Sequence, residues 1–170
     1  SDRLAELGRE GVLALVCDST NALVEGHSGS EGDVYPGLLE VVQKAKGRVA
    51  VTCFATNVAR VATVAKVAEA TGRRLALIGR SLHRLYEVSK ENGYLQSFPD
   101  VVPEDAVGRL PEEEVLMLVT GTQGEPRAAL SKLSRNEHHH VTLSPGDTVI
   151  YSSREIPGNE TYINRVRNHL

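Results

Sequence analysis

Residues 48–80 read RVAVTCFATNVARVATVAKVAEATGRRLALIGR and predict a β-strand, an α-helix and a second β-strand in succession. The apolar runs at residues 48–54 and 74–78 are short and do not alternate cleanly, which is typical of parallel strands covered on both faces. A helix is expected over residues 57–71, because polar residues recur every three positions in an apolar stretch and Gly72 follows as a terminator. This order favours a right-handed βαβ unit in a parallel sheet.

The same alternation extends to both sides of this unit. Further buried strands are expected at residues 11–17 and 115–120, and further helices at residues 33–46, 81–92, 126–134 and from about residue 159. Residues 148–152 follow a Pro-Gly-Asp turn and are candidates for a hairpin with residues 141–143. The pattern predicts the α/β class, as a Rossmann-like three-layer domain with a mainly parallel sheet flanked by helices.

Residues 96–111 interrupt this pattern. They contain three prolines and no long period, so we interpret them as an irregular crossing with one short helical turn. This is the loop that we expect to tolerate change best.

Composition limits the class of protein. A chain of 170 residues with 41% hydrophobic and 24% charged residues can bury one substantial core, which favours a single domain. No apolar run is long enough to span a bilayer, and the opening SDRLAELGREG does not resemble a signal peptide. We therefore expect a cytoplasmic protein without membrane contact. Cys17 and Cys53 have no partner at metal-type spacing and are expected to be reduced, buried thiols.

The charge balance does not favour general attraction to nucleic acid. The formal net charge is −3, aromatic residues make up 4% and tryptophan is absent, so both steering and base stacking are weak. Any RNA contact is therefore expected to be local and directed at phosphates.

Small polar residues follow four of the predicted strands. In a parallel sheet, ligands collect outside the carboxyl ends of the strands, where helix N-termini present free N–H groups. The four loops are Asp18-Ser19-Thr20-Asn21, Ala55-Thr56-Asn57, Gly79-Arg80-Ser81 and Gly121-Thr122-Gln123-Gly124-Glu125. Such loops suit phosphate, although each also suits ordinary helix capping, and only their convergence favours a ligand.

Several charged residues leave alternatives open. Asp18 could orient a histidine, hold a metal or close an Asx turn. Arg80 could pair with phosphate or with Glu87, which lies within helical reach. The histidines at 138–140 are adjacent and point in different directions, so they are poor joint ligands for one ion. The sequence has no HxHxDH, HExxH or paired CxxC motif, so no complete hydrolytic metal site is expected in this chain.

Six motifs together resemble a known family. They are CDSTNA (17–22), TCFATNVARV (52–61), GRSLHR (79–84), TGTQGEPRAALS (120–131), PGDTVIYSS (145–153) and IPGNE (156–160). In this order and spacing they are similar to the β-CASP segment of the RNase J family, which are ribonucleases with a metallo-β-lactamase fold. The resemblance implies one β-CASP domain over residues 1–170, with residues 1–25 and 155–170 near the junctions to a metallo-β-lactamase domain.

The resemblance also implies site residues. Asp18 matches the first β-CASP motif, an acidic residue with an orienting role beside the metal centre. The implied substrate-binding residues are Ser19, Thr20, Ala55, Thr56, Asn57, Arg80, Thr122, Gln123, Gly124 and Glu125. Thr56 and Thr122 stand where the family usually has serine. The family's HxHxDH motif, HxSGH motif and last histidine ligand are absent from this sequence, so no metal ligand is expected in it.

The implied function is RNA clamping within a metal-dependent ribonuclease. The parent would hold two divalent ions, Zn or Mn, and would cut RNA endonucleolytically, from the 5′ end, or both, in RNA processing and decay. Implied partners are single-stranded RNA, including RNA with a 5′-monophosphate, the metallo-β-lactamase domain of the same parent, and further copies in a homodimer or tetramer. This chain alone is expected to be inactive.

Two other classes remain open. A Rossmann-like module for a nucleotide or sugar phosphate would use the same loops, although no GxGxxG opens a helix and no acidic residue ends the second strand. A structural dimerisation domain would bind no ligand strongly.

Overall fold

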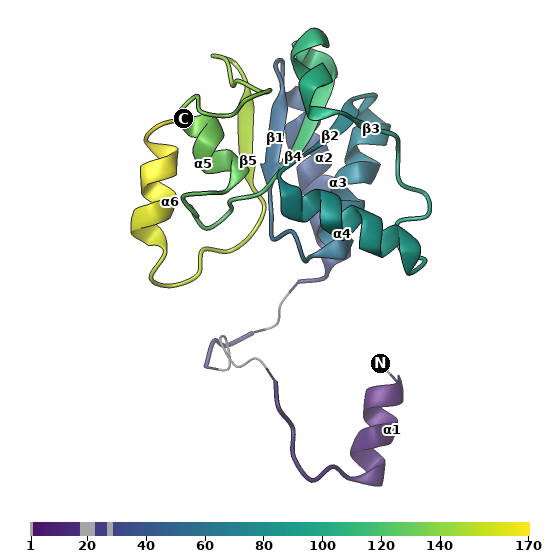
Figure 1. Cartoon of the computed structure of the whole chain (residues 1–170). Helices are drawn as coiled ribbons and strands as arrows, with labels where there is room; N and C mark the ends of the chain where they lie inside the picture. The colour runs from purple at the N-terminus through teal and green to yellow at the C-terminus, as the bar shows by residue number, and fades with distance from the viewer. Residues whose placement is uncertain (1, 18–22, 27–28) are drawn as a thin grey trace.

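The computed structural model describes residues 2–17, 23–26 and 29–170, and a parallel sheet forms the centre of the fold (Figure 1). Its five strands lie in the order β3-β2-β4-β1-β5. The strands are β1 (Val49–Thr52), β2 (Arg74–Ile78), β3 (Val101–Val102), β4 (Val115–Val119) and β5 (Thr148–Tyr151). All pairings are parallel, and β4 is buried along its whole length between β1 and β2.

Helices cover both faces of the sheet and make three layers. One face packs on α2 (Val34–Lys44), α3 (Val58–Thr71) and α4 (Arg80–Glu91), and the other packs on α5 (Ala129–Ser134), α6 (Glu160–Arg167) and the short 3-10 helix η2 (Glu104–Arg109). Alternate strand residues divide between the two cores, with Val51 and Leu118 on the first and Ala50 and Met117 on the second. The predicted α/β, Rossmann-like class is therefore confirmed.

Helix α3 shows why the central βαβ unit forms where the sequence predicts it. The Asn57 side chain accepts a hydrogen bond from the Arg60 N–H at 3.0 Å, which satisfies a free donor of the first turn. Gly72 ends the helix at φ +68°, a backbone conformation that glycine adopts without a Cβ penalty. Val61, Val64 and Val67 are buried between these ends.

The predicted strand at residues 11–17 is wrong. These residues form no strand, and Leu13 and Val16 are 105% and 96% exposed. They follow α1 (Asp2–Glu10), a helix that buries no residue. An apolar run indicates that a segment is suited to burial, but it does not show whether a neighbouring strand is present to pair with it. Cys17 is correspondingly exposed, whereas Cys53 is buried as expected.

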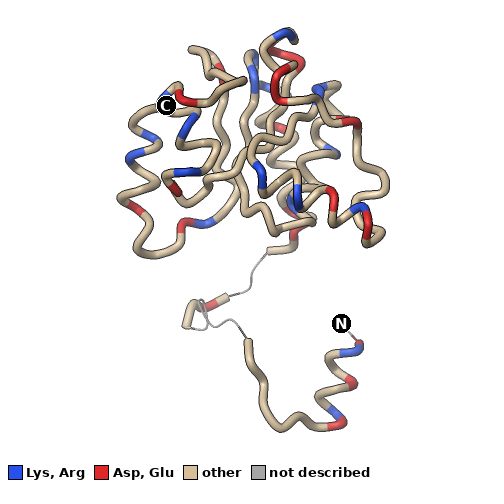
Figure 2. Tube along the Cα trace, viewed as in Figure 1, with Lys and Arg blue, Asp and Glu red and all other residues tan. Residues whose placement is uncertain are grey.

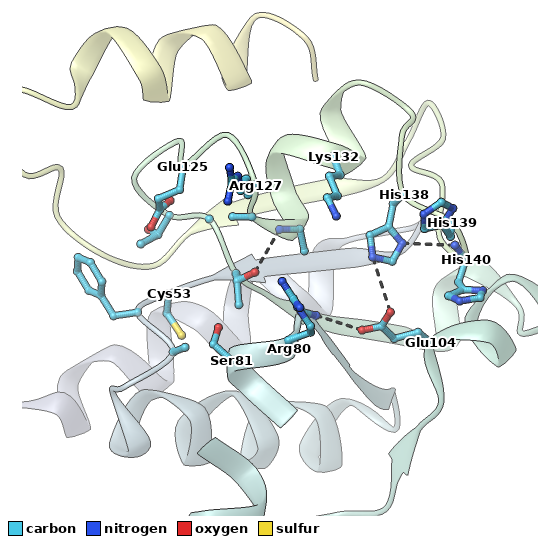
Figure 3. A pocket seen from close by; sticks show the side chains of 18 residues that line it. Cys53, Arg80, Ser81, Glu104, Glu125, Arg127, Lys132, His138, His139 and His140 are labelled. Atoms are coloured by element: carbon cyan, nitrogen blue, oxygen red, sulfur yellow. Dashed lines mark hydrogen bonds and ion pairs between the residues drawn. The ribbon is translucent and has the colours of Figure 1, made fainter. Parts of the chain in front are cut away.

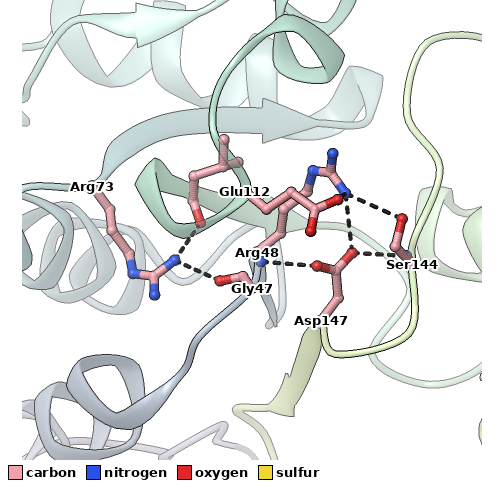
Figure 4. A network of polar contacts seen from close by, with 7 residues as sticks. Gly47, Arg48, Arg73, Glu112, Ser144 and Asp147 are labelled. Atoms are coloured by element: carbon pink, nitrogen blue, oxygen red, sulfur yellow. Dashed lines mark hydrogen bonds and ion pairs between the residues drawn. The ribbon is translucent and has the colours of Figure 1, made fainter.

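The predicted hairpin is also wrong, because residues 141–143 form no strand and β5 pairs in parallel with β1. The cause is a polar network at the amino ends of the strands (Figure 4). Asp147 accepts hydrogen bonds from the backbone N–H groups of Arg48 and Ser144, both at 2.8 Å. A Cβ at Gly47 would lie 2.8 Å from the Asp147 carboxylate, so only glycine allows this approach. The turn before β5 is thereby held against the start of β1.

Helix α5 and the irregular crossing also differ from the expectation. Helix α5 begins at Ala129 rather than at Pro126, because residues 125–128 form a turn closed by a hydrogen bond from Ala128 N–H to the Glu125 carbonyl. The crossing at 96–111 contains β3 as well as η2. In the parts of the chain that the structure describes, no helix is both long and apolar enough to cross a membrane.

Candidate functional site

A cavity of about 600 Å³ opens at the carboxyl ends of β1, β2 and β4 (Figure 3). The chain leaves β1 and β2 toward the α3 and α4 face, but leaves the intervening β4 toward α5, so the connections diverge here. This is the position at which parallel sheets bind ligands. We call the cavity the strand-end pocket; its lining includes Ala55, Gly79, Arg80, Ser81, Gly121, Thr122, Glu125, Arg127, Lys132 and His138 to His140.

Three of the four predicted loops therefore meet in one place. Ala55 comes from the loop after β1, Arg80 from the loop after β2, and Thr122 and Glu125 from the loop after β4. The fourth loop holds Asp18, Ser19 and Thr20 and lies outside the described residues, so their roles stay predictions. The expected convergence is confirmed for the loops that the structure describes.

Three permanently charged cations line the strand-end pocket. Arg80, Arg127 and Lys132 line it, and none forms an ion pair with any residue among those described. The alternative pairing of Arg80 with Glu87 is thus not observed. Guanidinium and ammonium groups gathered in a concave site favour an anion, and guanidinium matches the geometry of phosphate.

One carboxylate organises the opposite wall. Glu104 Oε1 accepts a hydrogen bond from the Gly79 N–H at 3.1 Å and lies 3.3 Å from His83 Nε2. Its Oε2 lies 3.7 Å from His138 Nε2. Burial lowers the pKa of His138, and the Glu104 charge opposes this shift. Glu104 belongs to the crossing that we expected to tolerate change best, and its contacts argue against that expectation at this position.

Three charged residues of this pocket are not singled out by the sequence. Glu104 and Lys132 belong to none of the six motifs, Arg127 lies within TGTQGEPRAALS but is not among the predicted site residues, and their shared location follows from the fold. The histidine triplet was the visible signal, but its ring centroids lie 6.5 Å apart for His138 and His140 and 6.4 Å apart for His139 and His140. The rings line the pocket separately rather than facing one point.

The residues after β1 divide between the pocket and the scaffold. Cys53, Phe54 and Ala55 line the pocket, whereas Thr56 and Asn57 do not, and the Asn57 side chain caps α3. Burial raises the pKa of Cys53 to about 11, so its thiol is neutral near pH 7 and unsuited to nucleophilic attack.

The loop after β4 fastens the C-terminal segment. Gln123 is buried; its amide donates to the Arg154 carbonyl at 2.9 Å and accepts from the Ile156 N–H at 2.8 Å and the Asn159 amide at 3.2 Å. Gly124 has φ +73°, and a Cβ there would lie 2.4 Å from the Tyr162 backbone. The Thr122 hydroxyl bonds to Ser153. These contacts explain why TGTQGEP and IPGNE occur together in one sequence.

A second cavity of about 400 Å³ lies beside α3. Its main cation, Arg60, is already paired with Glu31 and hydrogen-bonded to Ser152, so less charge remains for a ligand. Across residues 2–17, 23–26 and 29–170, no group of three or more His, Cys, Asp and Glu side chains is placed to hold a metal ion. The described residues therefore do not fit the metal centre of a hydrolase.

The fold and the strand-end pocket define a Rossmann-like domain suited to phosphate. The family model for "Ribonuclease J, beta-CASP domain" matches residues 46–170. The chain is 48% identical over 168 residues to ribonuclease J of Sinorhizobium meliloti, 46% over 158 residues to that of Mycolicibacterium smegmatis, and 42% over 168 residues to that of Thermus thermophilus. The chain belongs to the ribonuclease J β-CASP family.

The relatives are much longer than this chain. The alignments cover 99%, 92% and 99% of its residues, but only 30%, 28% and 29% of the lengths of the three relatives. The similarity thus assigns the domain, and it leaves the activity of a whole protein to be proposed.

Proposed function

We propose that this chain is the RNA-clamping domain of a cytoplasmic, metal-dependent ribonuclease. The observation that carries the proposal is the strand-end pocket, in a β-CASP domain whose relatives are named ribonuclease J. Three cations meet there that have no carboxylate partner within residues 2–17, 23–26 and 29–170. The parent would hydrolyse phosphodiester bonds endonucleolytically, from the 5′ end, or both, in RNA processing and decay.

The pocket would hold the RNA backbone by local charge. Figure 2 shows acidic and basic residues interspersed along the trace, in keeping with the net charge of −3, so attraction over the whole molecule is weak. Arg80, Arg127 and Lys132 would pair with phosphates, and the start of α4 also lines this cavity with Ser81. A single-stranded RNA, including one with a 5′-monophosphate, supplies the required anions.

Cleavage is assigned to another part of the parent. Because the described residues do not fit a metal centre, two divalent ions, Zn or Mn, would be held by a metallo-β-lactamase domain of the same parent. When bound there, the ions would supply the hydroxide for attack on phosphorus. The present residues bind and orient the RNA, Asp18 would orient the neighbouring centre, and the parent would assemble as a homodimer or tetramer.

RNA binding by the chain itself tests the proposal. Fluorescence anisotropy with a 5′-monophosphorylated single-stranded RNA should show weak binding that weakens further as salt is raised. Arg80→Ala should reduce the affinity roughly tenfold, as expected for one charge-assisted contact. Lys66→Ala is the matched control, because Lys66 is an exposed cation on α3 away from the pocket. Equal effects of the two substitutions would contradict the proposal.

The same titration separates the other two classes. A mononucleotide that displaces RNA at low concentration would indicate a nucleotide-binding module. A salt-independent dimer in light scattering, combined with no RNA affinity, would indicate a structural domain.

A further inference from the structure

Glu104 connects three separate elements around the strand-end pocket. It opens η2, and its carboxylate contacts the Gly79 N–H before α4, His83 within α4, and His138 after α5. The Glu104 side chain is 23% exposed and that of His138 is 10% exposed, so both lie mostly out of solvent. Figure 3 shows Glu104 pointing from its loop toward His138 and toward the turn that precedes Arg80.

A carboxylate in this position opposes anion binding by charge alone. It shares the pocket with Arg80, Arg127 and Lys132 and reduces their combined attraction for phosphate. Its presence is explained by what it holds. Gly79 has φ +120°, and a Cβ there would lie 2.5 Å from the Thr120 hydroxyl, so the turn is confined to glycine.

The Gly79 turn directly precedes Arg80, the first residue of α4. The Gly79 carbonyl accepts the Leu82 N–H at 3.0 Å and so begins the first turn of α4, while the Gly79 N–H is satisfied by Glu104 rather than by backbone. Loss of that acceptor would leave the N–H without its partner at the base of the pocket. Glu104 thus contacts the backbone of the residue directly before Arg80.

The other side of Glu104 faces a titratable group. His138 is surrounded by Lys132 of α5, by His139 and His140 of its own loop and by Glu104 of η2, and His83 of α4 lies across the carboxylate. Only Glu104 among them stabilises a protonated imidazole at 138; the lysine and the two neighbouring histidines disfavour it.

We infer that Glu104 is a positioning residue for RNA: it fixes the turn that presents Arg80, and through His138 it links RNA binding in the strand-end pocket to protonation. The inference rests on the proposed function, since it concerns the same pocket. A phosphate in the pocket favours the protonated imidazole, and burial lowers the pKa of His138. RNA affinity therefore rises as the pH falls below the ordinary histidine range.

Two uncharged replacements separate position from charge. Glu104→Gln keeps an oxygen that can accept from Gly79, whereas Glu104→Ala removes it, and both abolish the negative charge. At neutral pH the alanine variant should bind the RNA roughly tenfold more weakly than the glutamine variant. Equal affinities in the two variants would overturn the positioning role.

The pH profile tests the link to His138. Glu104 raises the pKa of His138 against the effect of burial, so its charge loss in Glu104→Gln should move the midpoint of the RNA-binding profile to lower pH. His169→Asn is the control, because this exposed histidine lies outside the pocket and should leave the profile unchanged. A midpoint that is the same in wild type and Glu104→Gln would overturn the link.

Folding and the proposed function are checked separately. Thermal unfolding shows whether both variants fold; if Glu104→Ala does not, the NMR titration of His138 in Glu104→Gln decides, and an unchanged midpoint there overturns the inference. RNA binding that Arg80→Ala weakens, together with equal affinities in the two Glu104 variants, would refute the Glu104 role alone. Absence of RNA binding by the wild-type chain would refute the proposed function and the inference with it.

Discussion

The two ends of the sheet use arginine in opposite ways. At the amino ends, Arg73 donates to three backbone carbonyls at 2.7 to 3.1 Å, and Arg48 contacts Asp147, Ser144 and Glu112. At the carboxyl ends, Arg80 and Arg127 line a cavity without a carboxylate partner among the described residues. Arginines whose donors are paired within the protein stabilise the fold, whereas cations that line a cavity without a partner are available to bind a ligand.

The largest effect on stability is expected at the amino ends. Asp147→Ala removes a nearly buried carboxylate that accepts from two backbone N–H groups and from Arg48, so it should lower the free energy of unfolding by about 3 kcal/mol. Urea denaturation measures this loss. Glu112→Ala is the control, because Glu112 is the exposed partner of Arg48. This substitution should lower the free energy of unfolding by less than about 1 kcal/mol.

This prediction also tests the contrast between the two ends. The folded fraction of Asp147→Ala should bind RNA as the wild type does, since the network lies at the opposite edge of the sheet from the strand-end pocket. A weakened RNA affinity in the folded protein would show that the two ends are not independent.

Gln123 lies at the carboxyl ends of the strands, but its side chain is hydrogen-bonded within the protein, as are those of Arg73 and Arg48. It is buried and makes three hydrogen bonds to the C-terminal segment. Gln123→Ala should lower the free energy of unfolding by roughly 2 kcal/mol. It should also speed hydrogen exchange at the Ile156 amide, because that N–H loses its acceptor. The exposed Gln43 on α2 is a matched control, and its replacement by alanine should change stability by less than about 0.5 kcal/mol.

The outcome at Gln123 decides between two roles. The sequence resemblance predicts an RNA contact, and the structure shows an anchor for the segment after β5. Unchanged stability of Gln123→Ala together with a loss of RNA affinity would indicate that Gln123 contacts RNA, as the resemblance predicts.

The sequence predicts this fold well where the signal is local. β2 has the expected bounds, and Asn57 and Gly72 mark α3 because caps depend on neighbouring residues. The errors concern distant partners. The parallel course of β5 depends on Asp147 meeting Arg48, 99 residues away, and the apolar run at residues 11–17 does not reveal what it would pack against.

The candidate site follows the same division. Convergence of the strand-end loops is predictable, because parallel strands end at one edge. Glu104 lies in the irregular crossing, 25 residues from Gly79, so no periodicity or motif predicts their contact. Arg127, in the turn before α5, and Lys132, within α5, reach the pocket because α5 packs against the sheet, and the sequence pattern does not predict which of their neighbours they meet there.

The smallest change in stability is expected at Lys132, a half-buried cation in the strand-end pocket. Lys132→Met keeps the length of the side chain and removes repulsion from Arg80 and Arg127, so the free energy of unfolding should stay within about 0.5 kcal/mol of the wild type. Because the Lys132 charge lowers the pKa of His138, its removal should raise that pKa, which NMR titration measures. RNA affinity should fall in the same variant. A clear loss of stability instead would mean that Lys132 is a scaffold cation like Arg48, and the contrast between the two ends of the sheet would no longer hold.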